Sequence, residues 1–588
     1  MSAGALVGDG LTMMRPTWFG PEGSPLFGWL HLPADQRVRG FVVLCPPIGL
    51  ELLITYRTLR ILADRLAAAG VGALRFSYAT TGDSAGDSAD PDRVARWLSS
   101  VADAVAYARS TGATSVVGVG LRLGATLAAS ASRTCAFDGL VLWDPCESGA
   151  SFLKEERALF RLGVPARERA SDLQGGIEGP GAVYDAETVA ELGRVRIEDL
   201  LDVQGDEGVG TAHPGAGPVL VVTRTESRAR EGVRRVASAA GVESREAPGQ
   251  PGLFDWHGMT VPVDTLEQIV SWTSRLLPDE RVEVTPQSRA AAVVATTEDG
   301  RAIRERVVEL GESRLFGIMT EVDGAGQTAM VLTNAAPPAC HLGPARLWVE
   351  LARTWAPRLG GVLRFDESGN GDSPGGDSDA TLPYTPAAVR DVVAAVQTAR
   401  AGGAREISLT GLCAGAWACL LAGDRVQVEE VNALNPGMWD VRPPSRTPAP
   451  GRASGPEGRR APVAMARHWA RLAVRHLLPE ALWWRLGRRG YIEAPAGLIT
   501  PLLRRGTRVG LLFGHREAAA FRQRRGERLV ARYGAGGLLL THEGAEIDHA
   551  LLSVEAREAV VDRLAAWVGA ERTQYSAPPP GSRVGGAA

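Results

Sequence analysis

The sequence predicts an α/β fold that is built twice, in tandem. In each half of the 588-residue chain, short apolar runs alternate with amphipathic helical stretches. Such alternation is typical of a mostly parallel sheet covered by helices on both faces. Three stretches of the first half also recur in the second half in the same order. Collinear recurrence of this kind indicates homologous domains.

The recurring stretches share an almost constant spacing. The pairs are 74–84 with 363–373, offset by 289 positions, and 119–125 with 410–416 and 142–145 with 433–436, both offset by 291. A solenoid would repeat every 20–50 residues or so. We therefore expect a first domain at 1–278, a second at 279–573, and a disordered Pro/Gly/Ser-rich tail at 574–588. The two domains are expected to pack together as a pseudo-symmetric pair.

Each half shows the same succession of predicted elements. In the first half, strands are expected at 41–44, 72–76 and 115–119, with helices around 61–69 and 94–110. In the second half, strands are expected at 329–332, 361–365, 406–410 and 508–513, with helices at 345–358, 387–401 and 554–568. Hairpin strands lead each core, and a helical cap is expected over each site. In the second half this cap combines a mobile loop at 441–460 with helices from 464 to about 488.

Composition excludes several classes of protein. The hydrophobic fraction is 45% and the charged fraction 22%, as in ordinary globular proteins. A net charge of -3 argues against a nucleic-acid-binding protein. No signal peptide and no membrane-spanning apolar run is evident. The six cysteines lack paired spacing, so we expect reduced cytoplasmic thiols, no metal site and no cofactor.

A turn of the form Gly-x-Cys-x-Gly ends the apolar run at 406–410. Cys413 lies at its centre, between Gly411 and Gly415. This is the form of the nucleophile elbow of α/β-hydrolases, a tight strand-to-helix turn that requires small neighbours. The alternative is a buried cysteine in a glycine-rich turn. In the elbow interpretation, an oxyanion hole would use the backbone N–H of Ala414 and one from the segment around Ala335.

A thiol nucleophile needs a base, and the base needs an acid to orient it. The order in α/β-hydrolases is nucleophile, acid, histidine. His549 lies just before the predicted final helix, where the catalytic histidine of this fold belongs. Glu517 follows the strand predicted at 508–513, and Asp548 is a weaker candidate for the acid. The sequence thus predicts a Cys-His-Glu triad in the second half.

The first half has arginine where a nucleophile is required. Arg122 occupies the elbow position, and a guanidinium only donates hydrogen bonds. Glu226 and His257 stand where the acid and the base are expected. Arg122 can pair with Glu226 in a filled, inert site, or it can form an anion-binding pocket for a carboxylate or phosphate.

The second half resembles the exosortase A system-associated hydrolases of the first type, a subgroup of bacterial α/β-hydrolases. The matching stretches are 363–373, 411–413, 434–436, 517–521 and 545–553. The first half resembles the second type through its elbow at 120–125. The resemblance covers most of the chain and implies the fold and a hydrolase-like site. The sequence departs from it at Glu517, where aspartate is usual, and at Ala414, where an acidic residue is usual.

These observations predict an acyl hydrolase or acyltransferase acting on esters, thioesters or lactones. Cys413 would form the acyl intermediate, and the substrate would be a small molecule or an acyl or peptidyl group, free or carrier-bound. The first half would then be a structural or substrate-binding pseudo-hydrolase. The alternative is a non-catalytic binding or scaffold protein in which both halves are pseudoenzymes.

Overall fold

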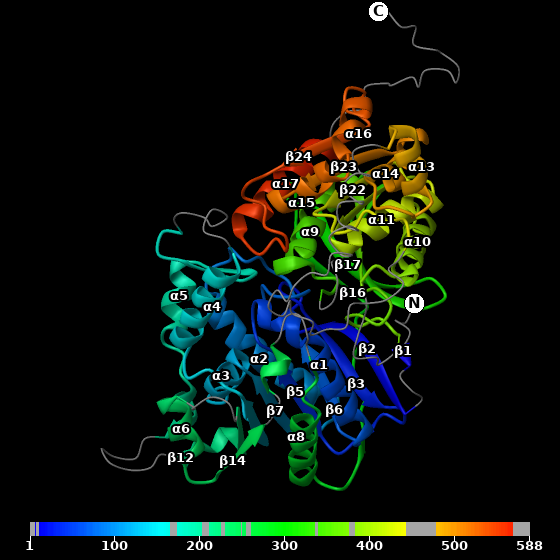
Figure 1. Cartoon of the computed structure of the whole chain (residues 1–588). Coiled ribbons are helices and arrows are strands. Elements are labelled where there is room, and N and C mark those ends of the chain that lie inside the picture. The colour runs from blue at the N-terminus through cyan, green and yellow to red at the C-terminus, as the bar shows by residue number, and fades with distance from the viewer. Residues whose placement is uncertain are drawn as a thin grey trace, which may run out of the picture.

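The computed structural model describes residues 6–7, 11–164, 173–202, 211–224, 230–247, 250–254, 260–334, 339–375, 383–442 and 478–568. It consists of two α/β-hydrolase domains, the first blue to green and the second green to red in Figure 1. Most of the loop predicted at 441–460, the cap helices predicted up to 477 and the tail at 574–588 lie outside the described residues.

Each domain is organised around a nine-stranded sheet with the same strand order. The first sheet runs β1 (Leu6–Val7), β2 (Thr12–Phe19), β3 (Leu26–Pro33), β6 (Gly72–Phe76), β5 (Phe41–Cys45), β7 (Val116–Leu121), β8 (Gly139–Trp143), β13 (Val219–Arg224), β14 (Val242–Ala247). The second runs β16 (Ala291–Thr296), β17 (Ala302–Leu310), β18 (Leu315–Val322), β20 (Gly360–Phe365), β19 (Thr328–Thr333), β21 (Glu406–Leu412), β22 (Glu430–Leu434), β23 (Arg508–Phe513), β24 (Leu539–Glu543). The leading strands of each sheet are antiparallel, and the strands from β6 and from β20 onward are parallel.

Helices cover both faces of each sheet, because the central strands are apolar on both sides. In the first domain, α1 (Leu50–Ala68) and α8 (Val263–Leu276) cover one face and α2 (Arg93–Ser110) and α3 (Leu123–Ala131) the other. In the second domain, α9 (Leu347–Leu359) and α17 (Val554–Val568) cover one face and α10 (Pro386–Ala401) and α11 (Ala414–Arg425) the other. The equivalent helices therefore occupy equivalent places.

Cap segments are inserted after the strand that follows each elbow helix. In the first domain they include α4 (Gly149–Gly163), the hairpin of β9 (Ile177–Gly179) and β10 (Ala182–Tyr184), and α5 (Ala186–Leu192). In the second they include α13 (Glu480–Arg488) and α14 (Pro495–Arg504). The remaining helices are α6 (Glu231–Ala237), α7 (Gln250–Leu253), α15 (His515–Gln523) and α16 (Gly526–Tyr533), and short strands are β4 (Arg37–Val38), β11 (Leu201–Asp202), β12 (Thr211–Ala212) and β15 (Val282–Glu283).

The predicted core elements agree with the structure to within a few residues, with one clear exception. Strand β23 and helix α17 have the predicted bounds. The helix expected around 61–69 begins at Leu50, eleven residues earlier. Its first turns carry Leu53, which packs against Cys340 and Val349 of the second domain. The periodicity of a helix that contacts two domains is not that of a one-sided amphipathic helix.

The domains meet through matching positions. Arg75 of the first domain pairs with Asp372 of the second at 2.5 Å, and Arg364 of the second pairs with Asp83 of the first. The two arginines are 289 positions apart in the sequence, and so are the two aspartates. An isologous contact, in which i meets j and j meets i, is the signature of two-fold symmetry. Phe27 and Phe316, also 289 apart, stack across the same contact.

Candidate active site

Cys413 lies at the sharp turn between β21 and α11. Its backbone has φ 53° and ψ -108°, a conformation that costs a non-glycine residue free energy. A Cβ at Gly411 would lie 2.5 Å from the backbone of Gly415, and a Cβ at Gly415 would lie 2.2 Å from the carbonyl oxygen of Asn334. The two glycines are therefore required by contact, and the turn has the geometry of a nucleophile elbow.

The structure brings His549 and Glu517 to this turn. Nδ1 of His549 bonds to Oε1 of Glu517 at 2.9 Å. Cys413 also hydrogen-bonds with His549, and this bond together with the one that His549 donates to Glu517 raises the pKa of His549 to about 10. Burial raises the pKa of the Cys413 thiol, but the hydrogen bond and positive charge of His549 outweigh it and leave that pKa below its ordinary value. The arrangement favours a thiolate–imidazolium pair.

Glu517 lies in the first turn of α15, and its side chain is nearly buried. Burial raises its pKa, while the bond to His549 more than compensates and lowers the pKa below the ordinary value. Asp548, the weaker candidate, has another task. Its carboxylate accepts the backbone N–H groups of Ala550, Leu552 and Ser553 and so shapes the loop that carries His549.

Asn435 is a further residue that fixes the histidine loop. Its side-chain amide donates to the carbonyl oxygens of Asp548 and His549 at 3.0 and 3.1 Å, and its side-chain oxygen accepts the N–H of Gly514 at 2.8 Å. It thus ties the loop after β22 to the loops before Glu517 and around His549. The only sequence signal for it is the recurring Leu-Asn-Pro motif, which matches Trp-Asp-Pro in the first half.

Tyr384 is a neighbour of Cys413 that no sequence motif indicates. Its hydroxyl lies 3.6 Å from Sγ of Cys413, and its ring packs edge-on against Trp417 of α11. Burial raises the pKa of Tyr384, so the phenol keeps its proton and can donate a hydrogen bond to a thiolate. Its φ of 60° is unusual for a large residue.

The predicted oxyanion donors are only partly described. Ala414 is the first residue of α11, and its N–H interacts with the Cys413 sulfur. A helix N-terminus is a favourable place for developing negative charge. Ala335 lies outside the described residues, which end at Asn334 and resume at Ala339.

The elbow of the first domain keeps the same strained turn around arginine. Arg122 has φ 55° and ψ -124°. Its guanidinium bonds to Glu51 at 2.9 Å and to Glu155 at 2.5 Å, and lies 3.6 Å from Asp144. Each of its three nitrogens thus has a carboxylate nearby. Arg122 also lines a cavity of about 260 Å³.

The other residues predicted for the first site, Glu226 and His257, lie outside the described residues. The sequence suggested Glu226 as the partner of Arg122. The described partners are Glu51 from α1 and Glu155 from the cap helix α4, which sequence order alone does not place near the elbow. An Arg122 neutralised by these carboxylates fits the filled, inert site better than the anion-binding pocket.

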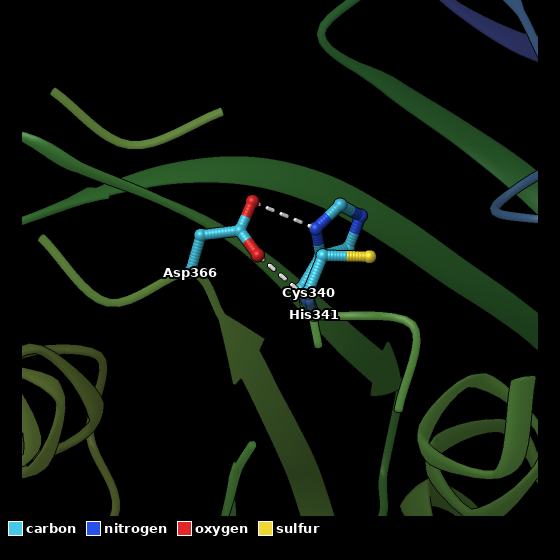
Figure 2. A group of neighbouring side chains, drawn as sticks. All are labelled: Cys340, His341 and Asp366. Carbon is cyan, nitrogen blue, oxygen red and sulfur yellow. Dashed lines mark hydrogen bonds and ion pairs between the residues drawn. The ribbon is translucent and has the colours of Figure 1, made fainter. Parts of the chain in front are cut away.

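A second cluster of chemically active groups, Cys340, His341 and Asp366, lies at the domain contact (Figure 2). Their ligand atoms lie within 4.8 Å of one another. Both ring nitrogens of His341 are engaged, one by Asp366 at 2.9 Å and the other by Asp83 of the first domain at 2.8 Å. A metal requires a neutral histidine and a thiolate.

The protonation states at this cluster are the opposite of those that a metal needs. Burial lowers the pKa of His341, but the charges of Asp366 and Asp83 outweigh it and raise the pKa to about 10. Burial also raises the pKa of the Cys340 thiol well above its ordinary value. The donor set fits an imidazolium clamped between two carboxylates, and we assign the cluster to the domain contact.

No helix among the described residues is long and apolar enough to cross a membrane. No protein-family model matches the sequence, and no curated protein matches it. Similar solved structures include Est1E from Butyrivibrio proteoclasticus with bound ferulic acid, at 16% identity and a TM-score of 0.33, over 44% of this chain and 98% of that one.

Two further structures are similar over one half of the chain. Brefeldin A esterase, described as a bacterial homologue of human hormone sensitive lipase, is 18% identical with a TM-score of 0.31, over 46% of this chain and 80% of that one. A soluble variant of monoglyceride lipase from Saccharomyces cerevisiae, in complex with a substrate analogue, is 13% identical with a TM-score of 0.33, over 47% and 100%. At these identities the likeness concerns the fold alone.

Proposed function

We propose that the second domain is an acyl hydrolase or acyltransferase with Cys413 as its nucleophile. The observation that carries the proposal is the connected set of Cys413, His549 and Glu517 at a strained strand-to-helix turn. Nucleophile, base and orienting acid in hydrogen-bond contact are the general signature of covalent catalysis. The lowered pKa of Cys413 increases the fraction of the thiol that is present as the nucleophilic thiolate.

The reaction follows from these roles. Sγ of Cys413 attacks the acyl carbonyl carbon, and the carbon–oxygen or carbon–sulfur bond to the leaving group breaks. His549 gives its proton to the departing alkoxide or thiolate, while Glu517 stabilises the imidazolium before this transfer. A second nucleophile, either water or a bound alcohol or amine, then gives a proton to His549 and attacks the thioester, which restores the thiolate.

The oxyanion that forms in each step needs donors that are already in place. The N–H of Ala414 interacts with the Cys413 sulfur, so in this proposal it lies beside the carbonyl oxygen of an acyl group bound to that sulfur. The protonated hydroxyl of Tyr384, 3.6 Å from Sγ, is a second donor in this proposal. A thiolate attacks activated acyl groups better than plain amides, so we propose esters, thioesters or lactones, including carrier-bound acyl groups, as substrates.

In this proposal the first domain takes no part in bond breaking. Its elbow carries Arg122, which donates hydrogen bonds to Glu51 and Glu155. A guanidinium has no lone pair with which to attack a carbonyl. We propose a structural role for this domain, through the contacts that it makes with the second.

The test is covalent labelling of the full chain with an activated ester such as a p-nitrophenyl ester, read by intact and peptide mass spectrometry. We expect one acyl group on Cys413 and its loss in His549→Ala. Cys135 is a matched control, because it is also half-buried and free, while burial raises its pKa to about 11. If Cys413 reacts no faster than Cys135, the enzyme proposal fails and the scaffold alternative takes its place.

A further inference from the structure

A groove on the second domain is lined by arginines and shares no lining residue with the Cys413 site. It lies between α13, α14 and α16, with a volume of about 740 Å³. The arginines that line it are Arg485, Arg488, Arg489, Arg504 and Arg532. In Figure 1, α13 and α16 lie at the end of the second domain away from the first domain.

The charge of this region is opposite to that of the chain. Residues 478–532 contain 12 arginines and four glutamates, a net charge of +8, whereas the whole chain carries -3. The 35 residues at 443–477 that precede α13 contain seven arginines and one glutamate, so they add further positive charge and only one acidic residue. A concentration of charge this strong attracts anions.

The groove arginines have no carboxylate partner among the described residues, whereas Arg508, Arg522 and Arg524 of the same region each pair with a glutamate. Glu480 is the one acidic residue that lines the groove, and it pairs with Arg528 at 3.3 Å. The five arginines that line the groove are exposed, so their charges are not compensated by the protein and are accessible to an anion.

The groove is held in shape by packing. Arg532 lies over the ring of Trp484 at 5.2 Å, and Trp484 is buried in the core of the domain. Gly487 of α13 packs closely on Ala494 before α14. The arginines therefore project from helices that are fixed to one another, and binding would not first have to order a loop.

We propose that this groove binds a soluble small molecule that carries two or more phosphate groups. Guanidinium groups bind phosphate oxygens through paired, planar N–H donors, more specifically than ammonium groups do. A volume of about 740 Å³ is that of a site for a small ligand, whereas a protein partner needs a broad surface. The site is independent of the proposed acyl chemistry.

The test uses inorganic tripolyphosphate as the probe and isothermal titration calorimetry of the full chain in about 0.15 M salt, where weak surface attraction is screened. We expect one binding site. Arg488→Gln and Arg504→Gln, on different helices, should each weaken binding about tenfold or more, since each removes charge-assisted hydrogen bonds to phosphate.

Arg505→Gln is the matched control. Arg505 is next to Arg504 in sequence, but it lines no part of the groove and pairs with Asp424 at 3.4 Å. Its removal should change the affinity by less than about twofold. All three side chains are exposed, so circular dichroism should show an unchanged fold. Acylation of Cys413 should also be unchanged in all three variants.

Three results would overturn the proposal. The first is no binding of tripolyphosphate. The second is equal weakening by Arg504→Gln and Arg505→Gln, which would show attraction to general surface charge. The third is stronger, groove-dependent binding of poly-glutamate or of phosphatidylglycerol vesicles, which would assign the groove to an acidic protein or to a membrane surface.

Discussion

Replacing Asp83 with asparagine removes one negative charge from the contact between the domains. The Asp83 side chain is 2% exposed. It accepts hydrogen bonds from His341 at 2.8 Å and from Arg364, both of the second domain. The two cations keep one carboxylate each, since Asp366 holds the other nitrogen of His341 at 2.9 Å and Glu305 lies 2.8 Å from Arg364. The substitution leaves buried positive charge only partly compensated.

The expected loss of stability follows from this geometry. Breaking a buried ion pair by removing one partner costs about 3–5 kcal/mol, because the remaining charge stays in a poorly solvated place. The value for Asp83→Asn should lie at the lower end, about 3 kcal/mol, since His341 can release its proton and so reduce the uncompensated charge. The matching substitution Asp372→Asn should act similarly, because Asp372 is buried and pairs with Arg75 at 2.5 Å.

Urea unfolding followed by tryptophan fluorescence measures this loss. Asp279→Asn is the control, since that side chain is fully exposed and pairs with Arg39 at the surface; its unfolding midpoint should equal that of the wild type. The pKa of His341, about 10, is above its ordinary 6.5. Its charge therefore stabilises the fold fully below about pH 6.5, and this contribution is lost as pH rises through about 10. Asp83→Asn should shift that loss to lower pH. A midpoint of Asp83→Asn equal to that of Asp279→Asn would refute the reasoning.

Four further predictions concern the two elbows. Glu517→Gln should lower the acylation rate of Cys413 about 10²–10⁴-fold with little change in substrate affinity, measured as kcat and KM separately, because the base loses its orienting charge. Tyr384→Phe should lower kcat about 10–100-fold while alkylation of Cys413 by iodoacetamide, which forms no oxyanion, changes far less; equal losses in both would contradict an oxyanion role. As pH rises, the alkylation rate of Cys413 should reach its plateau at a pH below the ordinary thiol pKa, and a profile with an ordinary thiol pKa would count against the ion pair. The stability that charged His549 contributes to the fold should fall as pH rises through about 10. Arg122→Ser should give no acylation of the first domain and should lower the urea midpoint, since it leaves buried Glu51 unpaired; labelling of that serine would contradict an inert site.

The sequence was sufficient for those parts of the site that depend on chain order. The elbow at Cys413 is predictable because its glycines are required by backbone contacts within a few residues. His549 and Glu517 are predictable because each lies in the segment that follows a strand of the parallel sheet, β24 or β23, and the ends of parallel strands meet at one edge. They are 32 positions apart in the sequence, and the order of the strands in the fold brings them to within a hydrogen bond of 2.9 Å.

The parts that could not be predicted depend on packing between elements that the sequence does not order. Tyr384 precedes α10 and reaches Cys413 only because that helix packs on α11. Glu51 and Glu155 reach Arg122 from α1 and from the cap, and both positions depend on how those helices cross the sheet. The ion pairs between domains depend on the relative placement of two folds, for which no local pattern exists.

A comparison of the two halves separates what holds the protein together from what performs its proposed chemistry. At the domain contact the equivalent positions carry the same residue type, as in Arg75 and Arg364 or Asp83 and Asp372, and each half supplies what the other needs. At the elbow the equivalent positions differ, with Arg122 in one half and Cys413 in the other, although both keep the strained turn. A change of residue at the first elbow therefore leaves the contact intact, whereas loss of Asp83 would leave buried His341 and Arg364 with one carboxylate each.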